Sequence, residues 1–168
     1  MGVKMSRGTH DWWAQGLQSM IAMPAEGTEI IEVIDSTPVP GGELAQVTVR
    51  APSGYIYEII SMMLAAPPVP GAASGTHSFE VRSEQGTVPI TYGESNYNDC
   101  VEYICGIWHT ATVGAIPTTE IAQIFCVRGL RIDSDSGIVV DYRNMTGATQ
   151  TDARIMYFWV RKVKVTEV

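Results

Sequence analysis

One turn in the chain has a spacing that suits a hard cation. Asp133 and Asp135 stand two residues apart and are followed by Gly137. Calcium loops begin in this way, because alternate side-chain oxygens converge on one ion. An EF-hand would also need Glu six residues after its glycine, and this chain has Arg143 there. We therefore expect an Asp/Gly hairpin turn and keep Asp133 and Asp135 as calcium candidates only.

Other groups that could carry out chemistry are scattered along the chain. A serine of the same turn, His109 and an aspartate would supply a hydrolytic triad, but no nucleophile elbow is present. Cys100, Cys105 and Cys126 lack CxxC spacing, and the three histidines lack paired ligand spacing. We expect free thiols, no cofactor and no enzymatic activity. Paired carboxylates for glycoside cleavage stay open, since their separation depends on the fold.

Charge and hydropathy exclude several kinds of partner. The chain has 11 Lys+Arg against 18 Asp+Glu, a net charge of −7 and a pI of about 4.8. Such a surface repels a phosphate backbone, so we expect no direct contact with nucleic acid. No apolar run approaches the roughly 18 residues that span a bilayer, and the first residues do not resemble a signal peptide. We expect no membrane partner and synthesis in the cytoplasm.

The elements that must position these groups are strands and turns. The 168 residues include 16 Gly and 9 Pro, with 45% hydrophobic and 17% charged residues, which suits many short strands in one core. We expect strands at 28–35, 44–50, 55–64, 77–82, 88–92, 100–109 and 121–127, and in three C-terminal runs that end near residue 165.

Three of these segments carry more specific expectations. The run 55–64 is almost continuously apolar, which predicts a central strand, and the proline-rich 66–75 predicts an exposed connection. The run 100–109 fits a bent strand with a bulge at Gly106, although helical spacing also fits it. Asn144-Met145-Thr146 matches a glycosylation acceptor, but we expect a turn there.

Together the segments predict an all-β protein. About ten strands exceed the seven of a simple immunoglobulin sandwich, and the long connections favour a jelly-roll-like β-sandwich of about 8–10 strands over a lipocalin-type barrel. We expect one β-sandwich domain over residues 28–168, preceded by an N-terminal arm over 1–27.

The arm has an apolar pattern that allows about three helical turns. Either it packs on its own domain as a helix, or it docks on a neighbouring subunit, because adjacent tryptophans are costly to expose. The interface candidates in the arm are Trp12, Trp13, Leu17, Met20 and Ile21.

A resemblance extends this interpretation. The order of 51–61, 74–77 and 129–147, with its strand rhythm and turn placement over roughly residues 40–168, resembles small jelly-roll structural proteins of tailed-bacteriophage virions. The resemblance implies a non-enzymatic subunit of the virion, made in the host cytoplasm, that decorates and stabilises the capsid. It also implies a homo-oligomer, a trimer in the first instance, that contacts major capsid or tail proteins.

Two alternatives to a decoration protein remain open. One is a tail, collar or baseplate structural protein, which would use the same kind of contact. The other is a jelly-roll carbohydrate-binding module, in which Tyr55, Tyr57 or Tyr97 would stack on sugar rings. Among the aromatic residues, Tyr97, Trp108 and Trp159 join the two arm tryptophans as candidate anchors for protein contacts.

Overall fold

The structure is a computed structural model that describes residues 27–87, 89–104, 107–112 and 130–165, with backbone alone at 104 and 107–112. Within these ranges every regular element is a strand. The expected all-β class is therefore confirmed. The arm, the helix considered for it and the strand expected at 121–127 lie outside the described residues.

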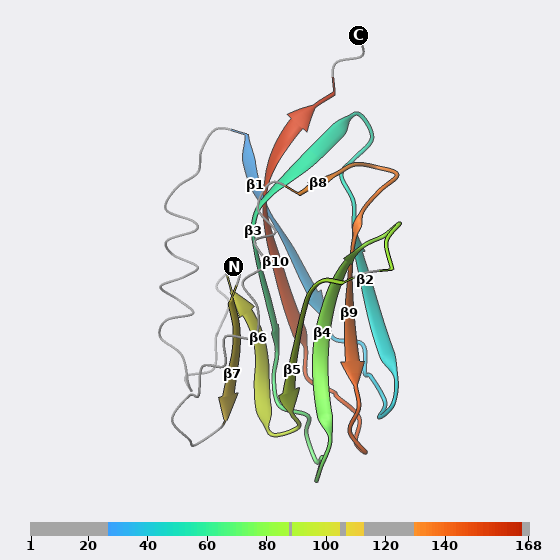
Figure 1. The fold of residues 1–168 in the computed structure, drawn as a ribbon, viewed down its shortest axis with the longest axis vertical. Helices are drawn as coiled ribbons and strands as arrows, with labels where there is room; N and C mark the ends of the chain where they lie inside the picture. Colours follow the sequence, from blue (N-terminus) through green and yellow to red (C-terminus); the bar gives the residue numbers. More distant parts are fainter. Residues whose placement is uncertain (1–26, 88, 105–106, 113–129, 166–168) are drawn as a thin grey trace.

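Ten strands form the described part of the chain (Figure 1). They are β1 (Thr28–Asp35), β2 (Leu44–Val49), β3 (Tyr55–Ala66), β4 (Thr76–Ser83), β5 (Pro89–Asn96), β6 (Asp99–Ile104), β7 (Ile107–Thr112), β8 (Arg131–Ile132), β9 (Ile138–Asn144) and β10 (Arg154–Lys164).

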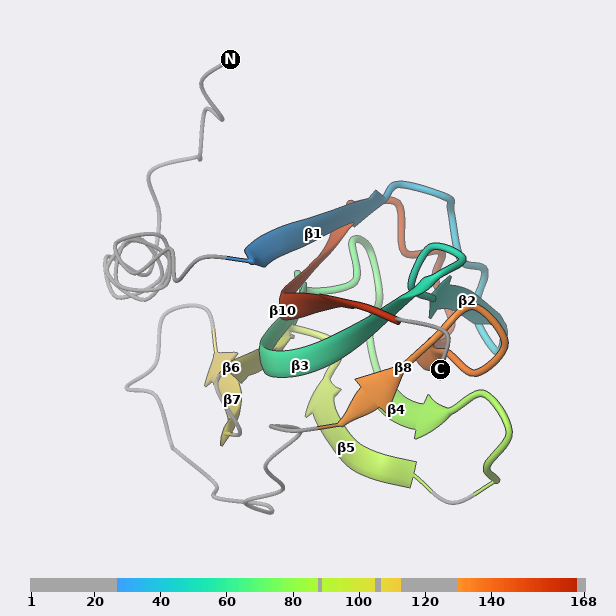
Figure 2. The same ribbon diagram turned by 90° about the horizontal axis from the view of Figure 1, so that it is seen from above.

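The strands form two antiparallel sheets that lie face to face (Figure 2). One sheet has the order β1-β10-β3-β6-β7, with β8 also paired to β3, and the other has the order β2-β9-β4-β5. The first strand thus pairs with the last, and the second with the last but one. This is the order of a jelly roll, in which one long antiparallel hairpin is rolled into two sheets. The expected jelly-roll-like sandwich is confirmed, and β7 and β8 are additions to it.

The core lies between the two sheets. Side chains alternate along β10 and β3, so that Phe158 and Met62 are paired on the inner side and fully buried. From the opposite sheet Phe79 and Tyr142 meet them, with their own ring centroids 5.3 Å apart. The expectation that β3 is central is correct, because β10 and β6 flank it.

Two local expectations need correction. The run 100–109 is not one bent strand, because the chain reverses between Ile104 and Ile107 and its halves pair as β6 and β7. The connection after β3 is exposed only in part. Val69 is buried and its N–H donates to the Tyr97 carbonyl at 2.8 Å, which anchors the proline-rich segment to the body.

Candidate interaction surface

A groove opens at one edge of the sandwich, where β1 is the edge strand of the first sheet and β2 is the edge strand of the second. Among the described strands, β1 pairs only with β10 and β2 only with β9, so each has a free edge. The cavity between them has a volume of about 560 Å³ and is lined by the end of β1, residues 37–40 of the connection and the start of β2. Leu44, in its lining, is 44% exposed. Free strand edges beside an exposed apolar side chain are suited to bind another extended chain.

A second apolar surface lies on the side of the six-stranded sheet that faces away from the core. Strand register places alternate residues of β1, β10 and β3 there. We call this set the outer apolar face: Ile30, Ile34, Met63, Ile155, Tyr157 and Trp159. Ile30 and Ile34 are 43% and 56% exposed, whereas Trp159 is half-buried. Of the two anchor candidates whose side chains the structure describes, Tyr97 and Trp159, Trp159 lies on this face; the side chain of Trp108 lies outside the described residues.

One polar pair lies within the outer apolar face, where Glu32 stands between Ile30 and Ile34 on β1, and another lies beside it. The Tyr157 hydroxyl donates to Glu32 Oε1 at 3.1 Å, and Arg161 forms an ion pair with Glu58 at 3.3 Å. The face therefore mixes apolar and charged side chains, and only Ile30 and Ile34 among its apolar members are exposed.

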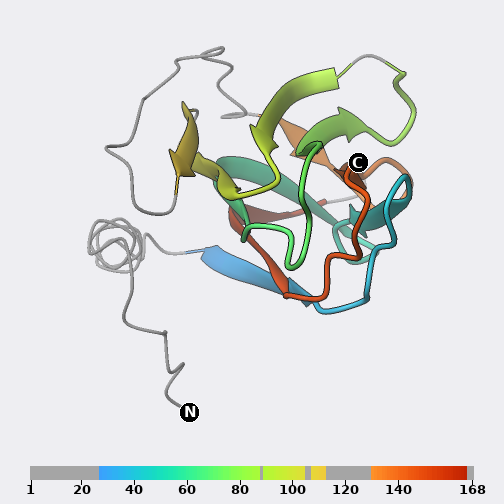
Figure 3. The same ribbon diagram turned by 90° about the horizontal axis from the view of Figure 1, so that it is seen from below.

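A buried polar network closes one end of the sandwich, where three connections meet (Figure 3). His77 is fully buried at the start of β4. Its Nε2 lies 2.8 Å from the Asp99 carbonyl, which can only accept, so Nε2 carries the proton. Nδ1 therefore accepts from the Tyr142 hydroxyl at 3.0 Å. Burial lowers the pKa of His77 and keeps the ring neutral, so this network orders the core.

Arg154 is fully buried in the same network at the start of β10. Its Nη2 donates to Asp35 Oδ2 at 2.8 Å and to the Thr37 carbonyl at 2.6 Å, and the guanidinium lies 5.0 Å from the Tyr142 ring centroid. Burial raises the pKa of Asp35, but hydrogen bonds from Arg154 and Thr37 outweigh this effect and lower it. The ion pair fixes the end of β1 to its neighbour β10 in the same sheet, and the contact with the Tyr142 ring on β9 ties this point to the opposite sheet.

The turn after β9 is closed by a buried asparagine. Asn144 Nδ2 donates to the carbonyls of Val39 and Ala148 at 2.8 and 2.7 Å. Its Oδ1 accepts from the Thr146 N–H and hydroxyl at 3.1 and 2.7 Å. Asn144 is fully buried, so the glycosylation triplet forms the expected turn and its asparagine is a structural residue.

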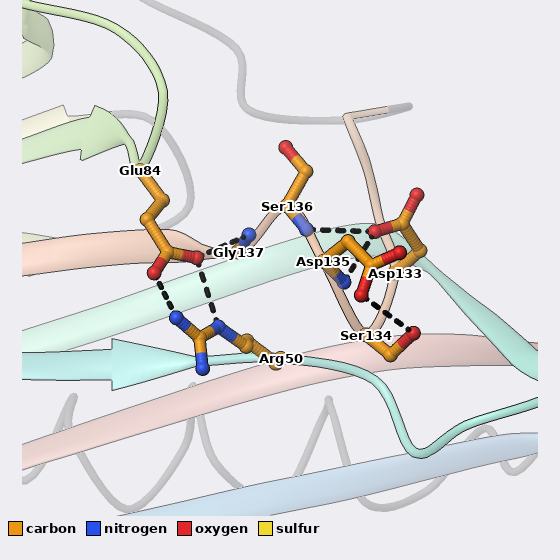
Figure 4. Close-up of polar contacts among 7 residues, drawn as sticks. All are labelled: Arg50, Glu84, Asp133, Ser134, Asp135, Ser136 and Gly137. Atoms are coloured by element: carbon orange, nitrogen blue, oxygen red, sulfur yellow. Dashed lines mark hydrogen bonds and ion pairs between the residues drawn. The ribbon is translucent and has the colours of Figure 1, made fainter.

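The candidate calcium ligands lie in the turn between β8 and β9 (Figure 4), at the other end of the sandwich (Figure 1). Asp133 Oδ1 accepts the N–H groups of Asp135 and Ser136 at 2.8 and 2.7 Å. The turn was expected to join a hairpin, but β8 belongs to one sheet and β9 to the other, so it carries the chain between sheets. Within the described ranges, no three His, Cys, Asp or Glu side chains gather as metal ligands.

An ion pair holds this turn against the body. Glu84 accepts from the guanidinium of Arg50 and, through Oε2, from the Gly137 N–H at 3.0 Å. These hydrogen bonds lower the pKa of Glu84 to about 2. A side chain on Gly137 would place its Cβ 2.6 Å from the Val49 carbonyl oxygen, so the close approach requires glycine. The carboxylates of Asp133 and Glu84 therefore stabilise the turn by accepting its backbone N–H groups.

The remaining candidates from the sequence fall into two groups. The arm residues Trp12, Trp13, Leu17, Met20 and Ile21 lie outside the described residues. Of the three tyrosines considered for sugar stacking, Tyr57 is only 6% exposed. It is not available for stacking, because it packs in the core between the sheets.

Two comparisons with known proteins add no relative. No protein-family model matches the chain, and no curated protein matches it either. In the part of the chain that the structure describes, no helix has the length and apolar content needed to cross a bilayer.

Proposed function

We propose that this protein is a non-enzymatic structural subunit that acts through protein–protein contacts, as a capsid decoration protein of a tailed-phage virion. The observation that carries the proposal is the groove between the free edges of β1 and β2, with its exposed apolar side chain Leu44. The virion and the trimeric state are supported by the resemblance in strand rhythm, which the jelly-roll order of the sheets accompanies.

The groove suggests how such a subunit would hold its neighbour. An extended segment of a neighbouring capsid protein would hydrogen bond to the free backbone groups of β1 or β2 and place apolar side chains in the cavity. Main-chain bonds would give affinity and the cavity would give specificity. The net charge of −7 would keep the exterior clear of packaged DNA, and the subunit would be made in the host cytoplasm before it joins the particle.

The proposal is tested by a charge placed in the groove. Leu44→Glu would put an unpaired carboxylate where the neighbour's apolar side chains must pack, and we expect binding to purified shells to weaken more than tenfold. The matched control is Tyr92→Glu on β5, because Tyr92 is 39% exposed and β5 lies at the edge of the second sheet opposite to β2, away from the groove.

Binding is measured by co-sedimentation of full-length protein with shells and, separately, with tails. Loss of shell binding in Leu44→Glu alone supports the decoration role, whereas binding to tails alone would select the tail, collar or baseplate alternative. Equal binding by both variants would refute the groove as the contact site. A purified glycan that competes for the groove would favour the carbohydrate-binding alternative instead.

A further inference from the structure

The backbone of the groove between β1 and β2 shows which strand a partner segment would join. In an antiparallel pair, each residue directs its N–H and its C=O to the same side, and successive residues alternate between the two sides. Three segments line the groove, namely residues 33–35 at the end of β1, residues 37–40 of the connection and residues 43–47 at the start of β2. Their hydrogen bonds differ, so they do not offer a partner the same number of backbone groups.

The start of β2 presents the longest unpaired stretch of backbone in the groove. The Asn144 N–H donates to the Glu43 carbonyl at 3.0 Å, so the odd-numbered residues of β2 direct their backbone groups to β9. Leu44 and Gln46 direct theirs away from β9. Among the described strands β2 pairs with β9 alone. The N–H and C=O groups of Leu44 and Gln46 therefore lie along a free edge within the groove.

The other two segments offer fewer backbone groups. The Lys162 N–H donates to the Gly27 carbonyl at 2.8 Å, so the odd-numbered residues of β1 direct their groups to β10. Of the β1 residues that line the groove, Ile34 alone directs its groups away. The prolines of the connection have no N–H, and the Val39 N–H between them donates to the Gln150 carbonyl at 3.0 Å. A partner segment therefore finds a longer edge on β2 than on β1.

The side chains of the groove determine what such a segment must carry. Val33, Ala45 and Val47 are half-buried and pack against the edge of the core, so the side of an added strand that faces them needs apolar side chains. Its residues opposite Leu44 and Gln46 would point to the outside of the sandwich, as these two do. The partner is therefore an extended segment with apolar side chains at every second position.

Charge distinguishes one end of the groove. Two carboxylates, those of Asp35 and Glu43, are in its lining. Asp35 is paired with Arg154, whereas Glu43 is exposed and forms no ion pair with a cation of the described residues. A cationic side chain of the partner would complement Glu43. Because Glu43 directly precedes β2, an antiparallel partner would carry this cation at its C-terminal end.

We propose that the groove binds one extended segment of a neighbouring protein as an antiparallel strand added to the free edge of β2. Alternate apolar side chains of the segment face Val33, Ala45 and Val47, and a cation at its C-terminal end meets Glu43. The strand is antiparallel because this pairing is the more stable per residue. The proposal rests on the proposed groove contact, for which it names the strand and the chemistry of the partner segment.

A labelled model peptide tests this binding mode with the full-length protein alone. The peptide Thr-Val-Thr-Val-Thr-Val-Thr-Lys has the required alternation and C-terminal cation, and fluorescence anisotropy measures its binding. When its valines face the groove, the amides of its threonines point to β2 and the amides of its valines point away. We expect methylation of the threonine amides to weaken binding more than tenfold, and methylation of the valine amides to change it by less than about threefold.

Two variants of Gln46 test the same hydrogen bonds from the side of the protein. Gln46→Pro removes an N–H that points away from β9, a change that edge strands accept. Gln46→Val is the matched control, because it keeps this N–H and removes only the side-chain amide, which donates to Asp141. We expect Gln46→Pro to bind the peptide at least tenfold more weakly than Gln46→Val, and Leu44→Glu to lose binding as well.

Several results would overturn the proposal. Absence of binding by the unmodified peptide, or equal loss after methylation of either set of amides, would reject the added strand. A greater loss in Ile34→Pro than in Gln46→Pro would move the strand to β1, and tighter binding of a peptide with its lysine at the N-terminal end would reject the antiparallel direction. Shell binding that is lost in Leu44→Glu, without any binding of the peptide, would keep the groove contact and reject only the added strand.

Discussion

Protonation of His77 should destabilise the folded protein between pH 7 and pH 5. The ring is fully buried, it donates from Nε2 to the Asp99 carbonyl, and its Nδ1 accepts from the Tyr142 hydroxyl. A second proton would occupy Nδ1, remove that acceptor and create a cation in the network that already holds the guanidinium of Arg154. The folded state therefore keeps His77 neutral.

The size and sign of the effect follow from proton linkage. Burial lowers the pKa of His77 in the folded protein below its ordinary 6.5. The unfolded chain then takes up the proton first as the pH falls, so stability is complete above pH 6.5 and is lost towards the folded pKa. Each pH unit corresponds to about 1.36 kcal/mol, so the loss at pH 5 is at most about 2 kcal/mol.

Urea unfolding followed by tryptophan fluorescence at pH 7, 6 and 5 measures this loss. His77→Gln retains an amide donor for Asp99 but cannot be protonated. We expect it to be about 1–3 kcal/mol less stable at pH 7 and to lose much less stability down to pH 5 than the wild-type chain.

The double variant His10→Gln/His109→Gln removes the other two histidines and should keep the wild-type response. The carboxyls of Asp35 and Glu84 have lowered pKa values, so they titrate below this window. An equal decline in wild type and His77→Gln would refute the assignment of the response to His77.

Three further predictions concern the framework. Arg154→Met should lower the free energy of unfolding by about 3 kcal/mol, because it leaves the carboxylate of Asp35 without its buried partner. Arg161→Met, at an exposed ion pair, should lower it by less than about 1 kcal/mol. Chemical denaturation compares the two variants. Gly75→Ala would bring Cβ within 2.6 Å of a carbonyl oxygen at a φ of 101° and should lower the melting temperature far more than Gly71→Ala, where φ is 71° and no atom lies within 4 Å. Asp133→Ala should cost about 1 kcal/mol by losing its turn hydrogen bonds, while calcium should leave the melting temperature of the wild-type chain unchanged.

The strands could be predicted from sequence because their signals are local. The bounds of β1 were expected at residues 28–35 and are found there. Alternation also marks the inner side of β4, where Phe79 and Val81 face the core. Local pattern and tertiary environment agree in these segments, so the period of two is enough to place their side chains.

The buried polar residues were not foreseen, although a signal exists for two of them. His77 has the same parity as Phe79, and Arg154 has the same parity as Met156 and Phe158. Parity alone does not tell whether a polar residue at the end of a strand is buried or exposed to solvent. The difference depends on which connections close over the end of the sandwich, and that is fixed by contacts between residues far apart in the chain.

No local sequence pattern predicts the groove, or the connection from one sheet to the other at the Asp133 turn. Leu44 and Ile34 line one cavity because the first and second strands lie at the same edge of different sheets. In the same way, the Asp133 turn follows hairpin chemistry but joins two sheets, because β8 pairs with β3 and not with β9. Strand order decides both features, and the turn residues alone do not specify strand order.

Native mass measurement of the purified full-length protein, alone and with purified shells, tests the central claim most directly. We expect a discrete homo-oligomer in solution, a trimer as the resemblance implies, and stoichiometric incorporation into shells. A monomer that ignores shells and turns over a substrate would contradict the account.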